Sequence, residues 1–86
     1  MSTGAAETAD ILVAYVRDEL LGGKGPTDLE AGDDLLGSGL VDSLGVMRLI
    51  GFIEQRLGVT VPPADVTIDH FMTVERIVDY LESRGD

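Results

Sequence analysis

Residues 43–58, SLGVMRLIGFIEQRLG, repeat apolar side chains at the spacing of an amphipathic helix. An α-helix turns by about 100° per residue, which brings positions i, i+3, i+4 and i+7 onto one face. The residues on that face are Val46, Leu49, Ile50, Ile53 and Leu57. Gly58 follows them, and glycine is the usual residue just beyond a helix C-terminus. The stretch therefore predicts a helix over residues 43–57 with one face on a core.

The opposite face of this helix is not simply polar. It carries Leu44, Met47, Arg48, Gly51 and Gln55. Leu44 and Met47 stand where a solvent-facing side usually has charged or amide side chains. Because exposed apolar side chains of this kind mark interaction sites, we expect Leu44, Met47 and Arg48 to face a partner protein.

Three further helices are predicted from the same signals. Residues 6–21 carry an apolar stripe, and the glycines and proline of residues 22–26 end it. A short helix is expected within residues 65–71, after two prolines. Thr73 can cap a last helix that runs on to Leu81. We therefore predict a single domain, residues 1–86, that is all-α: a four-helix bundle with a short third helix and a long loop between helices one and two.

The long loop, residues 22–41, contains leucines and a valine that we expect to pack partly on the core. Loops of this length are uncommon in compact domains and are usually functional. Residues 28–42 hold five acidic side chains and no basic one. This loop therefore favours a partner with a basic patch.

The composition excludes several function classes. The 86 residues have a formal net charge of −10, which argues against nucleic acid and anionic membranes as partners. Cysteine is absent, so the chain itself supplies no disulfide, thiolate nucleophile or cysteine metal ligand. Residues 1–10 lack the basic and apolar regions of a signal peptide, and no apolar run approaches the ~20 residues of a membrane span. We expect a cytoplasmic protein.

Three kinds of chemistry are weakly supported. Ser43 and the one histidine, His70, lack the motif and setting of a hydrolase, and His70 is expected to pack the short helix together with Phe71. The acids at positions 33, 34 and 42 do not have the spacing of a calcium loop. Residues 22–25, GGKG, lack the full phosphate-loop pattern. We expect no catalytic residue and no metal.

Ser43 has two interpretations. Asp42 and Ser43 are both common helix-capping residues, and a cap requires no further function. However, Ser43 also follows a glycine-rich acidic loop and is flanked by the apolar Leu44 and Met47. That setting favours a hydroxyl that other enzymes modify.

The chain resembles the acyl carrier protein superfamily from its first helix to Leu81. The resemblance rests on Asp42-Ser43-Leu44 after residues 35–41, LLGSGLV, on residues 58–62, GVTVP, and on residues 71–78, FMTVERIV. It implies that a phosphopantetheinyl transferase moves 4′-phosphopantetheine from coenzyme A to Ser43. Asp42 would cap the helix and help hold the transferase's metal-bound coenzyme A. The arm's thiol would hold an acyl or aminoacyl group as a thioester.

The branch of the family is suggested by departures from two patterns. Arg48 stands where fatty-acid carriers usually have an acid, and the Gly-Gly-x-Ser of peptidyl carrier domains is missing. The chain looks more like discrete carriers such as D-alanyl carriers and those of natural-product pathways, of polyketide or nonribosomal peptide type. The implied partners are an adenylate-forming ligase or acyltransferase and a downstream synthase or transferase, visited by a monomer. The alternative is an unmodified helical interaction module that uses the Leu44/Met47 face.

Overall fold

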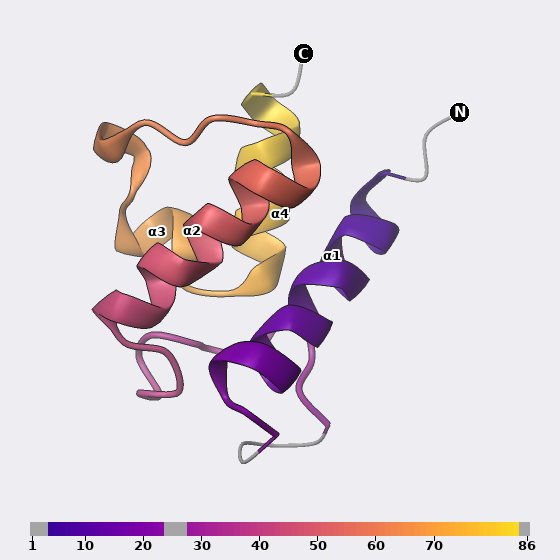
Figure 1. The fold of residues 1–86 in the computed structure, drawn as a ribbon, viewed down its shortest axis with the longest axis vertical. Helices are drawn as coiled ribbons and strands as arrows, with labels where there is room; N and C mark the ends of the chain where they lie inside the picture. The colour runs from indigo at the N-terminus through magenta and orange to yellow at the C-terminus, as the bar shows by residue number, and fades with distance from the viewer. Residues whose placement is uncertain (1–3, 24–27, 85–86) are drawn as a thin grey trace.

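The computed structural model describes residues 4–23 and 28–84, and the elements found there are helical (Figure 1). In chain order they are α1 (Gly4–Tyr15), a π-helical turn (Val16–Leu20), α2 (Ser43–Leu57), a 3₁₀ turn (Pro63–Asp65), α3 (Ile68–Phe71) and α4 (Val74–Arg84). No strand occurs within the described ranges. The predicted all-α bundle, with a short third helix and a long first loop, is confirmed.

Two of the sequence predictions lie partly outside the described residues. Residues 1–3, which are part of the segment that lacks a signal-peptide pattern, are not among those described. Residues 24–27 are also outside, and they include half of the GGKG segment and the proline expected to end the first helix. Within the described residues, no helix is long and apolar enough to cross a membrane.

Helix α2 begins and ends where its sequence predicts. Gly58 adopts a left-handed conformation with φ of 72°, and its N–H donates to the carbonyl of Glu54 at 3.0 Å. A side chain at Gly58 would be strained there, which explains the glycine. At the start of α4, the Thr73 hydroxyl accepts a hydrogen bond of 3.0 Å from the N–H of Arg76, as expected of a cap.

The first helix differs from the prediction in its last turn. The sequence predicts a continuous α-helix to residue 21, but the chain widens into a π-helical turn at Val16–Leu20. The Leu21 N–H donates to the Val16 carbonyl, five residues back, at 2.9 Å. Val16 stays fully buried, while Leu20 and Leu21 pack against the edge of the core. Apolar periodicity alone cannot distinguish this widened turn from an α-helical one.

The core is formed by one face of each long helix and by the long loop. Helix α1 packs on α4, and α3 packs on α4. The buried residues are Leu12, Val16, Leu29, Leu35, Val41, Val46, Leu49, Ile50, Ile53, Val61, Phe71, Val74, Ile77, Val78 and Tyr80. No polar or charged residue is buried among the described residues. The bundle is therefore held mainly by apolar burial.

The long loop is anchored to the bundle at several points. Leu29, Leu35 and Val41 are buried, as the loop's apolar residues led us to expect. The Leu35 N–H donates to the Met72 carbonyl at 2.8 Å, and the Val41 N–H donates to the Leu35 carbonyl at 2.9 Å. These contacts fix the direction from which the chain enters α2.

Candidate functional site: the start of helix α2

Asp42, and not Ser43, caps helix α2. Asp42 has extended backbone angles, φ −102° and ψ −173°, and its Oδ1 accepts a hydrogen bond of 2.8 Å from the Gly45 N–H. Ser43 is the first residue inside the helix. The interpretation of Ser43 as the cap is therefore wrong, because the neighbouring carboxylate already fills that role.

The Ser43 hydroxyl is exposed and has no hydrogen-bond partner among the described residues. Two other serines can be compared with it. The Ser38 hydroxyl donates to the Asp34 carbonyl, and the Ser83 hydroxyl donates to the Tyr80 carbonyl at 3.0 Å. Ser43 is thus the one of these three whose oxygen is both exposed and unengaged.

Gly45 allows the loop to lie close against the start of α2. A Cβ on Gly45 would come within 2.8 Å of the Val41 Cγ1. Val41 is buried and β-branched, so it has little freedom to move aside. The glycine after Asp42-Ser43-Leu44 is therefore explained by packing.

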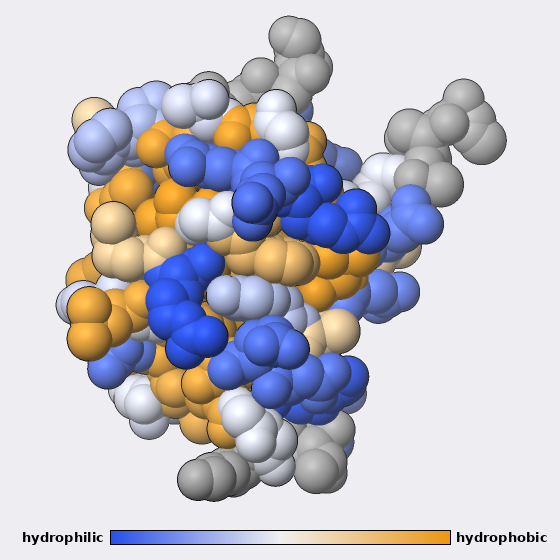
Figure 2. All heavy atoms as spheres, in the orientation of Figure 1, coloured by the Kyte–Doolittle hydropathy of each residue, from blue (hydrophilic) through white to orange (hydrophobic). Residues whose placement is uncertain are grey.

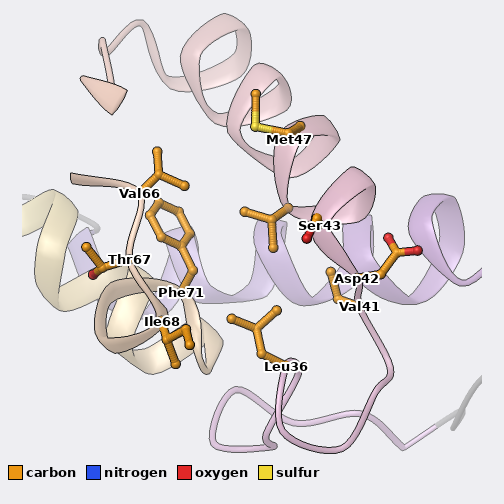
Figure 3. A pocket seen from close by; sticks show the side chains of 10 residues that line it. Leu36, Val41, Asp42, Ser43, Met47, Val66, Thr67, Ile68 and Phe71 are labelled. Atoms are coloured by element: carbon orange, nitrogen blue, oxygen red, sulfur yellow. The ribbon is translucent and has the colours of Figure 1, made fainter. Parts of the chain in front are cut away.

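An apolar cleft opens beside Ser43 (Figure 3). Its volume is about 460 Å³, and its walls come from the long loop, from α2 and from the segment that enters α3. The side chains of Leu36, Val66 and Phe71 point toward its centre, whereas the Asp42 carboxylate points away. The lining residues are Leu36, Val41, Asp42, Ser43, Val46, Met47, Val66, Thr67, Ile68 and Phe71.

The cleft was not predicted from the sequence. Ile68 in its rim is 66% exposed, although it is a large apolar residue. Val66 precedes α3 and is half-buried, and Ile68 is the first residue of α3. Only the packing of that segment opposite α2 turns them into a cleft wall.

The residues proposed to face a partner lie on the outer side of α2. Leu44 is 75% exposed and Met47 is 61% exposed, and Arg48 is exposed as well. The helical periodicity predicted this outward placement. Tyr15 on α1 stacks on Phe52 of α2, with ring centroids 4.0 Å apart, beside this surface.

His70 lies away from Ser43. It lines a separate hollow with Asp69, Arg76 and Tyr80. Its Nδ1 is 2.8 Å from the Asp65 carbonyl oxygen, and its ring lies against Tyr80 with centroids 4.6 Å apart. The expectation that His70 packs the short helix is confirmed, and the pair considered for a hydrolase, Ser43 and His70, lines two different hollows.

The acids considered for metal binding are engaged with the backbone. Asp33 accepts from the Glu30 N–H at 2.9 Å, and Asp34 accepts from the Gly37 N–H at 2.7 Å. In the part of the chain that the structure describes, no three histidine, cysteine, aspartate or glutamate side chains gather as metal ligands do. These carboxylates shape the loop.

Comparisons with known proteins agree with this architecture. A family model described as "Phosphopantetheine attachment site" matches residues 11–81. The chain is 39% identical over 49 residues to a D-alanyl carrier protein of Listeria monocytogenes serotype 4a (strain HCC23). That alignment covers 57% of this chain and 63% of the relative, which is less than two thirds of its length.

The fold is also similar to a chain in a structure described as "Crystal structure of FAD-dependent dehydrogenase". The TM-score is 0.75 and the identity 28%, over 83% of this chain and 99% of that chain. The family match runs from α1 to α4. The protein therefore belongs to the phosphopantetheine attachment site family, whose members hold a covalent 4′-phosphopantetheine and act as carriers rather than as catalysts.

Proposed function

We propose that Ser43 carries the phosphopantetheine arm. The observation that carries this assignment is the exposed, unengaged Ser43 hydroxyl at the first position of α2, next to a cap supplied by Asp42. Ser38 and Ser83 are poorer acceptors, because their hydroxyls donate to backbone carbonyls. A transferase would have to break those contacts first.

The local electrostatics suit a phosphodiester at this position. A helix N-terminus has N–H groups without intrahelical partners, and its dipole favours negative charge. The Asp42 carboxylate already takes one of these N–H groups, that of Gly45, so the phosphate would use the others. We propose that Asp42 also helps to hold the transferase's metal-bound coenzyme A.

We further propose an aminoacyl or short acyl cargo, loaded by an adenylate-forming ligase. The support is the 39% identity to a D-alanyl carrier protein over 49 residues. A polyketide-type acyl group, loaded by an acyltransferase, is the second candidate. Either cargo would serve a natural-product pathway of nonribosomal peptide or polyketide type, with cytoplasmic enzymes and a monomeric carrier.

The cleft beside Ser43 offers the arm or its cargo an apolar wall. The walls of the cleft include the side chains of Leu36, Val66 and Phe71 (Figure 3). Binding of an apolar portion of the cargo there would be favourable, because that portion would leave water. A strongly polar cargo would not be stabilised by this burial and would stay in solvent.

The structurally similar chain suggests one further class of downstream enzyme. It belongs to a structure described as an FAD-dependent dehydrogenase. The alignment covers 99% of that chain but 83% of this one, so that chain is the shorter of the two. We include a flavin-dependent dehydrogenase beside a synthase or transferase among the enzymes to be offered the loaded protein.

A loading assay tests the cargo. The protein is first primed with coenzyme A and a broad-specificity phosphopantetheinyl transferase, and is then offered ATP, an amino acid or short acid, and candidate ligases. We expect a thioester that hydroxylamine releases and that Ser43→Ala abolishes, with Ser38→Ala as the matched control. An acyl group that persists on Ser43→Ala would contradict the assignment.

The second candidate function is an unmodified interaction module. The observation in its favour is that Leu44 and Met47 are exposed whether or not Ser43 is modified. A partner that binds wild-type protein and Ser43→Ala equally well, together with a Ser43 that no transferase primes, would favour this module over the carrier.

A further inference from the structure

The connection between α2 and α4 has two different sides in residues 62–71. Four residues of this segment line the cleft beside Ser43: Val66, Thr67, Ile68 and Phe71. Figure 2 shows hydrophobic atoms at the surface on the left of the molecule, where α3 and the start of α2 lie in Figure 1. Asp65 and His70 do not line the cleft, and both contact Tyr80 of α4 instead. The segment therefore has an apolar side toward the cleft and a polar attachment to α4.

Asp65 fastens this segment with both its side chain and its backbone. Its Oδ2 accepts a hydrogen bond of 2.5 Å from the Tyr80 hydroxyl. Its carbonyl oxygen accepts a hydrogen bond of 3.0 Å from the Thr67 N–H and lies 2.8 Å from the His70 Nδ1. Because a carbonyl oxygen can only accept, the His70 Nδ1 carries the proton in that contact. Asp65 thus links the 3₁₀ turn to both α3 and α4.

Tyr80 is a fixed attachment point for Asp65. The Tyr80 residue is 7% exposed, and its ring centroid lies 4.6 Å from that of His70 and 6.0 Å from that of Phe71. A hydroxyl that donates to a carboxylate forms a charge-assisted hydrogen bond, which is stronger than a bond between neutral groups. This bond joins a buried ring of α4 to the residue that directly precedes Val66.

Apolar burial fixes only one end of this wall of the cleft. Phe71 is 2% exposed, whereas Val66 is half-buried and Ile68 is exposed. Helix α3 has four residues, and an isolated helix of that length is not stable in water. The position of Val66 and Ile68 opposite α2 therefore depends on the hydrogen bond between Asp65 and Tyr80.

We propose that Asp65 and Tyr80 are positioning residues that hold the α3 side of the cleft, and that they thereby determine how well the cleft shelters an acyl group on the arm. Neither residue lines the cleft, so both act through Val66 and Ile68. This inference rests on the carrier function and the cleft-bound cargo proposed above. Its consequence is that the loss of one polar bond, on the far side of the segment, exposes the cargo to solvent.

The first test uses the unmodified protein with isotope-labelled valine and isoleucine methyl groups. Relaxation dispersion of the Val66 and Ile68 methyl signals measures the population in which the segment is displaced. We expect Tyr80→Phe and Asp65→Ala to raise this population by about ten-fold, because each removes a hydrogen bond to a charged group. The methyl signals of Ile53, which is fully buried in α2, should not change. A loss of overall stability alone would not distinguish these methyl groups in the folded protein.

Two variants serve as matched controls. Asp65→Asn keeps an oxygen that can accept from the Tyr80 hydroxyl, so it should retain most of the wild-type behaviour. Ser83→Ala removes a different hydrogen bond, the one of 3.0 Å within α4 from the Ser83 hydroxyl to the Tyr80 carbonyl, and it should leave the Val66 and Ile68 signals unchanged. Unchanged signals in Tyr80→Phe, or equal changes in Tyr80→Phe and Ser83→Ala, would overturn the proposal.

The second test uses loaded protein. A broad-specificity phosphopantetheinyl transferase attaches the arm from octanoyl-coenzyme A or acetyl-coenzyme A, and cleavage of the thioester by hydroxylamine is followed by intact mass. The octanoyl thioester of the wild-type protein should react more slowly than octanoyl-coenzyme A itself. Tyr80→Phe should lose most of this protection, whereas the acetyl thioester should react at the same rate in both proteins. Full protection of the octanoyl thioester in Tyr80→Phe would overturn the proposal.

The two tests separate this inference from the function on which it rests. A protein that is not primed would contradict the carrier function, and a wild-type octanoyl thioester without protection would contradict the cleft-bound cargo. The methyl signals of the unmodified protein depend on neither result. They therefore still show whether the bond between Asp65 and Tyr80 positions Val66 and Ile68.

Discussion

The Asp42 carboxylate accepts a hydrogen bond from the Gly45 N–H at 2.8 Å, and the Ser43 hydroxyl between them has no part in capping α2. Two adjacent residues of similar capping ability are therefore separated in function by geometry. Removing Asp42 should act on stability, whereas removing the Ser43 hydroxyl should act on modification.

The cap gives the first prediction. Asp42→Ala should lower the free energy of unfolding by about 1 kcal/mol, because it removes the acceptor for the Gly45 N–H. Asp42→Asn should retain most of the stability, since asparagine caps nearly as well. Urea denaturation measures both. Equal stability of wild type and Asp42→Ala would show that the carboxylate does not hold the helix start.

The second prediction concerns the proposed role of Asp42 in priming. Asp42→Asn keeps an acceptor for the cap but loses the charge that would help to hold metal-bound coenzyme A. We expect its kcat/KM for phosphopantetheinyl transfer to fall by about 10²-fold, on the order of 3 kcal/mol, with a normal urea midpoint. Priming at the wild-type rate would limit Asp42 to capping.

The two glycines of α2 give a matched pair. Gly51→Ala should raise the free energy of unfolding by about 0.5–1 kcal/mol, because the new methyl group meets open space and alanine favours a helix. Gly45→Ala should lower it by about 1–3 kcal/mol, because the methyl group would lie 2.8 Å from the Val41 Cγ1. Thermal and urea unfolding would reveal these opposite signs. The same sign for both variants would contradict the packing described for Val41.

The fourth prediction concerns pH. The Arg17 guanidinium donates a hydrogen bond of 2.9 Å to Asp18, and this bond lowers the pKa of that carboxyl below its ordinary value. A carboxyl whose folded-state pKa is lowered adds stability above its unfolded-state pKa and loses it as the pH falls through the folded value. Both side chains are exposed to water, so the effect on unfolding should be small.

Carbon-detected NMR titration of the Asp18 carboxyl measures the shift directly. We expect Arg17→Gln to move its midpoint upward, toward that of an ordinary aspartate. An unmoved midpoint would show that Arg17 does not hold Asp18 in solution.

The helices were predictable because local signals determine where they begin and end. The apolar period of α2, the glycine at 58 and the threonine at 73 each act within one helical turn. The π-helical turn at Val16–Leu20 was missed, since its widened hydrogen bonding depends on how Leu20 and Leu21 meet the core. The spacing of apolar residues in the sequence does not reveal tertiary contacts of this kind.

The site was partly predictable for the same reason. Ser43 and its outward neighbours Leu44, Met47 and Arg48 follow from the position of the helix start and from the helical period. Which of Asp42 and Ser43 caps the helix is decided by a backbone angle that the sequence does not reveal. The cleft beside Ser43 was missed because it requires the loop, α2 and the segment before Phe71 to meet in space.

The most direct test of the central claim is the position of the phosphopantetheine group. The wild-type protein and the Ser43→Ala, Ser38→Ala and Ser83→Ala variants are incubated with coenzyme A, magnesium and a broad-specificity phosphopantetheinyl transferase. Intact mass and fragmentation of the modified peptide are then recorded. We predict one group, on Ser43, in every protein except Ser43→Ala. A wild-type protein that stays unmodified although folded and helical, or a group on another serine, would contradict the claim.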